Sequence, residues 1–304
     1  MNRRTKKLSV CWSLGDLCVT AHILIVDGAP SASQDLLVAH GGRRHGPNYA
    51  QALASQAHES VGGVETFVLA AADGADLPQG MALGDFDGIA WTGSPLNAYH
   101  DTPEVTRQIA FARAAFQAGV PCFGSCWGLQ VMMAGLGGKV RKNPKGSEMG
   151  VARSILLTEA GRAHPMYHGK SPVFDALCVH QDEVCDVPCG AEILAGNGIS
   201  EVQAVSLRDG ERSFWGVQYH PEYDLLQIAA MFSRSAQRMV DRGYAASLEE
   251  AQAFAADLRA LHDDPGRKDL AWRYGIGADI IDTDRHRREF SNWLRVEVAP
   301  RLAA

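Results

Sequence analysis

The chain has 304 residues, of which 46% are hydrophobic and 21% are charged, and its formal net charge is −6. These values are ordinary for a soluble globular protein, and the length allows one large domain or a domain with an appendage. Basic residues cluster only in RTKK near the start and DRHRR near the end, so neither nucleic-acid nor membrane-surface binding is indicated. No stretch approaches the roughly 18 apolar residues of a membrane span.

The cysteines indicate the cellular compartment, and the N-terminal stretch indicates where the fold begins. Seven cysteines without paired CxxC spacing argue against a disulfide framework or a structural zinc site and favour the reducing cytoplasm. A basic, mildly apolar stretch opens the chain, but Ser13, Gly15 and Asp16 interrupt it, which makes a poor signal peptide. We interpret residues 1–20 as a dispensable or non-native extension rather than a functional leader, and we expect the ordered fold to begin near Ala21.

From His22 onward the sequence predicts strands that alternate with helices. HILIVD is a β-branched run that ends in Gly28-Ala29-Pro30, as expected for a buried strand followed by a loop. Thr102 and Pro103 mark the start of a long predicted helix, and Gly119 marks its end. This alternation predicts a parallel sheet with helices on both faces. The expected strands are 22–27, 64–70, 88–92 and 120–126, and the expected helices are 48–59, 102–119 and 127–138.

The second half of the chain has a different pattern of predicted secondary structure. Residues 139–218 contain short strand-like segments, and Asp209-Gly210 between two of them is a hairpin signal. Residues 221–242 are again helical, and the tail carries helical periodicity that predicts two or three helices. We expect a main domain at 21–242 and a helical extension at 243–304 packed on it, since the tail is below the usual size of a separate catalytic domain. The aromatic residues of the tail, Trp272, Tyr274, Phe290 and Trp293, are expected in a core or an interface.

The heptapeptide GSCWGLQ at 124–130 holds the first candidate for chemistry. Cys126 falls at a predicted junction of strand and helix, where a sharp turn lifts a side chain from the carboxyl edge of the sheet. Glycines are needed nearby because such a turn strains the backbone and leaves little room. The following helix offers its N-terminal dipole to a thiolate and its free N–H groups to an oxyanion. The alternative is a small buried cysteine in a glycine-rich turn; Cys122, within the strand, is interpreted as a buried cysteine of this kind.

QYHPE at 218–222 supplies a candidate base. His220 follows a predicted strand, so it can point from the same sheet edge, and Glu222 is close enough to hold its imidazole. Pro221 between them restricts the backbone that sets their relation. Alone, this triplet would indicate only a surface histidine at a helix start. With Cys126 94 residues earlier, it predicts a Cys-His-Glu triad.

A third loop, Thr92-Gly93-Ser94-Pro95, also follows a predicted strand. A glycine there leaves backbone N–H groups accessible, as an oxyanion hole requires. By itself the segment would be a simple turn. Three loops at one sheet edge favour a catalytic site.

These three motifs, in this order and at these separations, resemble the class I (triad-type) glutamine amidotransferases. Within that family the chain is most similar to stand-alone proteins related to the amidotransferase domain of GMP synthase, over roughly residues 21–242. The resemblance implies an α/β fold, a flavodoxin-like three-layer sandwich with a central, mostly parallel sheet, a β-rich insertion and a C-terminal helical extension. We expect no cofactor and no metal.

The resemblance also implies roles for individual residues. Cys126 would attack the side-chain amide carbon of glutamine, and His220, held by Glu222, would pass a proton to departing ammonia before the thioester is hydrolysed to glutamate. N–H groups of Trp127 and of the Gly93-Ser94 turn would bind the oxyanion. The residues that match the family's substrate-site segments are Gln130, Glu148, Met149, Gly150, His180 and Asp182. A packing role is an alternative for Gln130, and for His180 we expect mainly a structural role in the pocket wall.

Two groups outside these motifs are interpreted as structural. Arg43 and Arg44 could meet a carboxylate or a phosphate, but a solvated loop explains them better. Cys178, Cys185 and Cys189 are expected to have packing or loop roles.

Three functions remain open. The first is a glutamine amidotransferase that hydrolyses L-glutamine and passes the ammonia to a synthase. That synthase would be a separate subunit, because the chain has no GxxxxGK[ST] phosphate loop and no room for a synthase. A free-standing γ-glutamyl hydrolase or peptidase would use the same thiol on a glutamine-like conjugate. A non-catalytic binding protein is disfavoured, since it has no physical reason to keep the triad. The pocket beside Cys126 separates the first two functions, because ammonia needs only a narrow exit whereas a larger amine needs an open cleft.

Overall fold

The structure is a computed structural model that describes residues 19–57 and 61–303. Its strands form one large sheet and one small sheet. They are β1 (Thr20–Asp27), β2 (Gly63–Ala70), β3 (Gly88–Trp91), β4 (Cys122–Ser125), β5 (Lys139–Lys142), β6 (Glu148–Leu157), β7 (Val173–His180), β8 (Asp182–Asp186), β9 (Ala191–Gly196), β10 (Ala204–Asp209) and β11 (Arg212–Val217).

The large sheet has the order β2-β1-β3-β4-β11-β10-β9-β6-β7, and β5 pairs with β8 in the small one. Strands β2, β1, β3, β4 and β11 run parallel, and the remaining strands of the large sheet continue it in antiparallel fashion. The predicted hairpin at Asp209-Gly210 is present and turns β10 back onto β11. The β-rich region therefore extends the parallel sheet, and the predicted flavodoxin-like α/β fold is confirmed.

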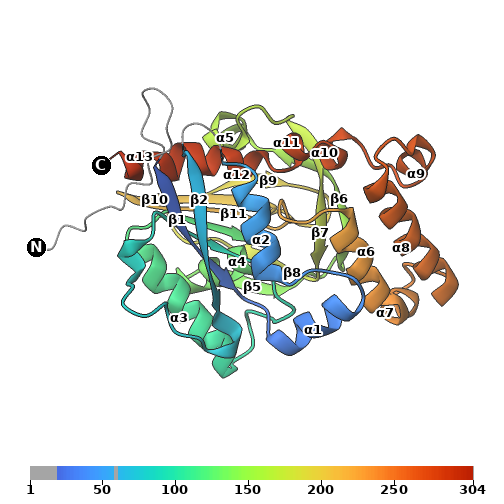
Figure 1. Ribbon diagram of the computed structural model, residues 1–304, viewed down its shortest axis with the longest axis horizontal. Helices are drawn as coiled ribbons and strands as arrows, with labels where there is room; N and C mark the ends of the chain where they lie inside the picture. Colours follow the sequence, from blue (N-terminus) through green and yellow to red (C-terminus); the bar gives the residue numbers. More distant parts are fainter. Residues whose placement is uncertain (1–18, 58–60, 304) are drawn as a thin grey trace, which may run out of the picture.

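Helices cover both faces of this sheet (Figure 1). They are α1 (Ser31–Ala39), α2 (His45–Ala54), α3 (Pro103–Gln117), α4 (Trp127–Gly135), α5 (Glu159–Ala163), α6 (Leu225–Arg234), α7 (Ala236–Asp241), α8 (Leu248–Asp263), α9 (Lys268–Arg273), α10 (Ala278–Ile281), α11 (Thr283–His286), α12 (Arg288–Trp293) and α13 (Ala299–Leu302), with a π-helical turn η4 (Leu294–Val298). Strand β1 is buried along most of its length, as expected for a parallel strand covered on both faces.

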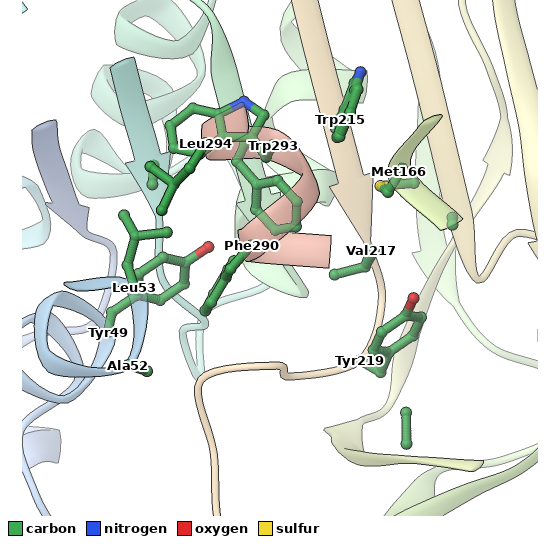
Figure 2. Close-up of a cluster of buried hydrophobic side chains, with 14 of the residues drawn as sticks. Tyr49, Ala52, Leu53, Met166, Trp215, Val217, Tyr219, Phe290, Trp293 and Leu294 are labelled. Carbon is green, nitrogen blue, oxygen red and sulfur yellow. The ribbon is translucent and has the colours of Figure 1, made fainter. Parts of the chain in front are cut away.

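Three apolar clusters lie between the sheet and its helices among the described residues, and one of them packs α6 and α8 against β7. Another joins α3 and α4 to β1, β3 and β4. The third joins α2 to the C-terminal segment: Tyr49 of α2 lies beside Phe290 of α12, with ring centroids 5.1 Å apart. Figure 2 shows these side chains together with Trp293 and with Trp215 and Val217 of β11, which belong to the same buried cluster. The end of the chain thus supplies part of the layer that covers the parallel strands.

The C-terminal segment differs in detail from its prediction. In place of two or three helices, residues 248–302 form the long helix α8 followed by several short ones. The short helices are interrupted at Gly275 and begin again after Asp282, whose side chain accepts the N–H groups of the next turn. Phe290 and Trp293 are fully buried, but Trp272 is 90% exposed, so of the two positions expected for that tryptophan, core or interface, the core is excluded. Helical periodicity predicted that the segment is helical but did not predict where its helices end.

Three helix boundaries also differ from their predictions. The helix expected at 48–59 begins earlier, at His45, and ends at Ala54; residues 58–60 lie outside the described residues. Helix α1 was not predicted. The helix expected from Pro221 begins only at Leu225, because the Asp224 side chain caps it by accepting the N–H of Gln227 at 2.9 Å.

The expected N-terminal extension falls almost entirely outside the described residues, which begin at Val19 with β1 following at Thr20. Among the residues that the structure describes, no helix combines the length and the apolar character that a membrane crossing requires.

Candidate active site

Three loops meet where neighbouring parallel strands end. Strands β3, β4 and β11 are adjacent in the sheet, so their carboxyl ends lie side by side. Gly93 follows β3, Cys126 follows β4 and His220 follows β11. Ligands of open α/β sheets bind outside the carboxyl ends of the strands, so the topology brings the three sequence motifs to one place.

Cys126 lies on a sharp turn between β4 and α4. Its φ of 51° and ψ of −100° are unusual for a residue with a side chain, and its N–H donates to the Val217 carbonyl at 2.7 Å. The flanking glycines allow this turn. A Cβ on Gly124 would lie 2.5 Å from the Gly128 backbone, and one on Gly128 would lie 2.4 Å from Cβ of Trp91.

His220 is held between a carboxylate and the thiol. Its Nδ1 lies 2.7 Å from Oε1 of Glu222, and both side chains are almost completely buried. Burial acts to lower the pKa of His220, but the charge of Glu222 and the hydrogen bond to Cys126 outweigh it and raise this pKa to about 10. The geometry therefore favours an imidazolium beside the Cys126 sulfur at neutral pH.

Residues outside the predicted motifs support this histidine. Tyr223 stacks on the His220 ring at a centroid distance of 3.9 Å, and its hydroxyl is hydrogen-bonded to Nδ1 of His45 at 3.1 Å. Asn48 donates to the Glu222 carbonyl. Tyr223 directly follows the QYHPE motif, which could have drawn attention to it; His45 and Asn48 carry no sequence signal, because only the fold brings α2 to this edge.

The loop after β3 approaches the histidine closely. A Cβ on Gly93 would lie 2.7 Å from Cε1 of His220, so glycine is required by space. The Thr92 hydroxyl accepts from the Gly28 N–H at 3.0 Å, which ties this loop to the end of β1. Trp127 opens α4, and N–H groups of a first helical turn have no acceptor within the helix. Its indole is anchored away from the thiol, donating to Gln108 at 2.8 Å.

A cavity of about 230 Å³ opens beside the thiol. Of the residues predicted for the site, the following line it: Ser94, Cys126, Gln130, Met149, His180, Asp182 and His220. Gly93, Trp127, Glu148, Gly150 and Glu222 do not. The cavity also reaches residues that the sequence had not indicated, at Ser33, His45, Tyr223 and the arginine-bearing face of α6 and α7. The cavity beside Cys126 therefore extends beyond the residues that the sequence had indicated.

Two of the lining residues are tied to each other. The Gln130 amide nitrogen donates to the Asp182 carbonyl at 3.3 Å and to Oε1 of Gln218 at 3.2 Å. The Asp182 carboxylate accepts from the Asn97 amide and the Tyr99 hydroxyl. Gln130 and Asp182 therefore form one polar wall of the cavity.

Glu148, Cys178 and His180 form a second Cys-His-Glu group. Their ligand atoms all lie within 4.8 Å of one another, close enough to hold a metal ion. Oε2 of Glu148 accepts from Nε2 of His180 at 2.9 Å and from Gln203 at 2.7 Å, and Asn197 binds its other oxygen. The second ring nitrogen of His180 faces the Asp182 carbonyl. Since these polar atoms are already bonded within the protein, a structural network explains the group without a metal.

The other residues singled out in the sequence lie outside the cavity beside Cys126. Arg43 pairs with Asp224 and Arg44 with Asp35, so both meet carboxylates of the protein itself. Gly150 lines a separate apolar cavity of about 160 Å³ between the sheet and α8. Cys185 and Cys189 are exposed.

Comparison with solved structures defines the class of fold. The chain is similar to a glutamine amidotransferase from Thermotoga maritima, with 14% identity, a TM-score of 0.58 and coverage of 90% of this chain and 98% of the other. A glutamine amidotransferase from Methylobacillus flagellatus gives 17% identity, a TM-score of 0.56 and coverage of 91% and 95%. At these identities the likeness concerns the fold, which is that of the flavodoxin-like amidotransferases.

Comparison of sequences establishes the family. The family model for glutamine amidotransferase class-I matches residues 49–234. A γ-glutamyl-L-1-hydroxyisopropylamide hydrolase from a Pseudomonas species is 34% identical over 72% of this chain and 75% of its own length. A GMP synthase (glutamine-hydrolysing) from Nitrosomonas eutropha is 34% identical over 52% of this chain but only 30% of its own. A γ-glutamyl peptidase 3 from Arabidopsis thaliana is 30% identical over 49% and 59%. The chain belongs to the class I glutamine amidotransferase family.

Proposed function

We propose that the protein hydrolyses the amide bond of a γ-glutamyl compound through a thioester on Cys126. The observation that carries this proposal is a thiol on a strained turn that lines the same cavity as His220, whose Nδ1 lies 2.7 Å from Oε1 of Glu222. The overall reaction is a γ-glutamyl amide plus water giving glutamate plus an amine. When the substrate is L-glutamine, the amine is ammonia.

The steps follow from the positions of the side chains. The Cys126 sulfur attacks the γ-carbonyl carbon, and the oxyanion that forms faces the N–H groups of Trp127 and of the Gly93-Ser94 turn. The His220 imidazolium gives its proton to the departing amine nitrogen as the carbon–nitrogen bond breaks, leaving the thioester. His220 then accepts a proton from water, whose oxygen attacks the thioester, and glutamate leaves with the thiol restored. Glu222 keeps Nδ1 protonated and the ring oriented throughout.

The cavity supports an amine larger than ammonia as a leaving group. It extends past His220 to Ser33, His45 and Arg234, which is more room than ammonia needs. The hydrolase from Pseudomonas, whose name specifies a γ-glutamyl alkylamide, also covers more of this chain than the GMP synthase does. We therefore place a free-standing γ-glutamyl amide hydrolase first.

Delivery of ammonia to a separate synthase subunit is the second candidate. The similarity to glutamine-hydrolysing GMP synthases supports it, since this chain spans 30% of one of them. On this proposal glutamine is the substrate and another polypeptide accepts the ammonia. The free thiols of the described cysteines support a reducing compartment such as the cytoplasm for either function.

The test is to incubate the purified chain with L-glutamine and, separately, with γ-glutamyl-ethylamide, and to follow glutamate release. A Cys126→Ser variant is the inactive control and Cys178→Ser is the matched thiol control. Turnover of the ethylamide at a kcat/KM at least equal to that of glutamine supports the first candidate. Turnover of glutamine alone supports the second, and no turnover of either by folded protein contradicts both.

A further inference from the structure

Three arginines lie along one side of the cavity, at Arg234, Arg238 and Arg242. Arg234 ends α6, Arg238 lies in α7 and Arg242 follows α7, and all three line the cavity. Among the cavity-lining residues that the structure describes, the only carboxylate is that of Asp182, and it already accepts from Asn97 and Tyr99. The lining on the α6–α7 side is therefore positively charged.

Within residues 19–57 and 61–303, none of these three guanidinium groups has a carboxylate within 4.0 Å. Arg234 donates to the Ser33 carbonyl at 3.3 Å, and Arg242 donates to Ser147 and Gln181. Arg43, in contrast, pairs with Asp224, the cap residue that precedes α6. The protein thus supplies counterions elsewhere but leaves this face of the cavity without one.

Arg234 is partly buried, and burial together with the neighbouring charge of Arg238 lowers its pKa. A guanidinium that has lost part of its hydration without gaining an anion is unfavourable in free energy. An anionic group in the cavity would restore the missing interactions, and arginine binds carboxylates with particular geometric specificity.

The reaction chemistry indicates which end of the substrate would meet these arginines. The leaving nitrogen has to lie beside His220, which protonates it. Tyr223 stacks on His220 and bonds to His45, and all three line the cavity together with Arg234. Gln130 and Asp182 form a separate wall of the cavity. The arginine face is consequently on the side of the departing amine.

We propose that Arg234 and Arg238 form a subsite for a carboxylate carried by the departing amine, so that the preferred substrates are γ-glutamyl amino acids rather than neutral γ-glutamyl alkylamides. This inference rests on the proposed function of the same site. The carboxylate takes no part in the bond changes; it holds the leaving nitrogen against His220. Arg242, which is already bonded to Ser147 and Gln181, extends the positive face outward.

The test compares two substrates that differ in one charge, γ-glutamyl-alanine and γ-glutamyl-alaninamide. Both carry the same γ-glutamyl α-carboxylate, so the ratio of their kcat/KM values reports only on the leaving group. We expect the wild-type chain to favour the carboxylate substrate by about tenfold or more, as a charge-assisted hydrogen bond allows. Arg238→Gln and Arg234→Gln should each bring the ratio towards one, and Arg234→Lys should retain part of the preference.

The matched control is Arg212→Gln. Arg212 is exposed at the β10–β11 hairpin, pairs with Asp209 and does not line the cavity, so this variant should keep the wild-type ratio. A wild-type ratio near one contradicts the proposal, as does a ratio unchanged by both substitutions. Equal loss on both substrates would mean that the arginines hold the shared α-carboxylate, which also overturns a leaving-group subsite.

Binding to a Cys126→Ala variant separates this inference from the proposed function. If the wild-type chain hydrolyses neither compound, calorimetric titration of Cys126→Ala with both compounds still tests the subsite. Tighter binding of γ-glutamyl-alanine that is lost with Arg238→Gln supports the carboxylate subsite while the proposed hydrolysis fails. Hydrolysis of both compounds without a preference supports the function and overturns the subsite.

Discussion

Two groups in this protein contain the same three residue types, and we propose a catalytic role for only one of them. The Cys126 group comprises Cys126, His220 and Glu222, and the Cys178 group comprises Cys178, His180 and Glu148. In both, a buried glutamate binds the histidine at hydrogen-bond distance, 2.7 Å in the first and 2.9 Å in the second. Composition and proximity therefore do not distinguish a catalytic group from a structural one.

The backbone under each cysteine makes the difference. Cys126 follows a strand on a turn with positive φ and lines the cavity, whereas Cys178 lies within β7 and is fully buried. Burial, together with the charge of Glu148, raises the pKa of the Cys178 thiol well above its usual value. A thiol that is kept neutral and away from substrate is a poor nucleophile.

The histidines differ as well. Glu222 binds Nδ1 of His220 and leaves the other nitrogen for Cys126. His180 has both ring nitrogens occupied, one by Glu148 and one by the Asp182 carbonyl. A general base needs a nitrogen that faces the nucleophile, and only His220 offers one.

The largest expected effect is the loss of the nucleophile. Cys126→Ser should lower kcat for γ-glutamyl amide hydrolysis by about 10⁴-fold or more, because a hydroxyl is a far weaker nucleophile than a thiolate. Cys178→Ala should leave kcat within a few-fold and lower the free energy of unfolding by about 1 kcal/mol. Glutamate release and urea unfolding measure the two effects. Equal loss of activity in both variants would contradict a catalytic role for Cys126 and a structural role for Cys178.

The second prediction concerns the two glutamates. Glu222→Gln should lower kcat by about 10²- to 10⁴-fold, because an amide no longer stabilises the His220 imidazolium. Glu148→Gln should act mainly on stability, at a cost of about 2–3 kcal/mol, because Glu148 accepts hydrogen bonds from three side chains. Kinetics beside chemical denaturation separate these outcomes. A Glu148→Gln enzyme of normal stability but without activity would point to a direct role in catalysis.

The third prediction uses the charge states of buried histidines. Burial, with nearby positive charges, lowers the pKa of His45 and of His286 to about 3 in each case. Between pH 6.5 and 3 the unfolded chain therefore binds protons that the folded chain does not, and stability falls as the pH decreases. At pH 5 the expected loss is about 2 kcal/mol for each histidine.

For His220 the sign is opposite. Its pKa is raised to about 10, so its contribution to stability is complete below pH 6.5 and is lost as the pH rises through 10. Urea unfolding at intervals from pH 4 to 10 measures the free energy of unfolding on both sides: the acid limb, where it falls as the pH decreases, and the alkaline limb, where it falls as the pH rises. His286→Gln should reduce the acid limb, since glutamine can still donate to the Tyr223 carbonyl that His286 contacts. An acid limb that is the same in this variant contradicts the assignment.

The smallest expected effect tests how the end of the chain supports the Cys126 group. The Tyr219 hydroxyl, one residue before His220, donates to Glu289 of α12 at 2.6 Å. Tyr219→Phe should lower the free energy of unfolding by about 1–2 kcal/mol and change kcat only a few-fold, because the stacking of Tyr223 and the bond to Glu222 remain. Tyr167→Phe, which loses only the bond to the Tyr219 hydroxyl, is the matched control. A loss of kcat as large as that expected for Glu222→Gln would assign the tail a direct part in orienting His220.

Local signals explain how much could be predicted in advance. The parallel strands are short apolar runs that end in small or turn residues, so β1 to β4 were expected close to where they lie. Cys126, His220 and Gly93 each follow such a strand, and strand ends of a parallel sheet share one edge. Helix boundaries such as those of α2 and α6 were less accurate, because they depend on caps such as Asp224.

By itself the sequence determined the α/β fold class, the family resemblance and the three segments that hold the candidate catalytic residues, because these depend on local periodicity and on short motifs. Only the tertiary structure decided that Tyr223 and His45 support His220, that Glu148 bonds within the protein and that the end of the chain covers the sheet. It also decided that three arginines line the same cavity as Cys126 and His220. These relations join residues far apart in the chain, and no periodicity or motif records which distant side chains the packed sheet will bring together.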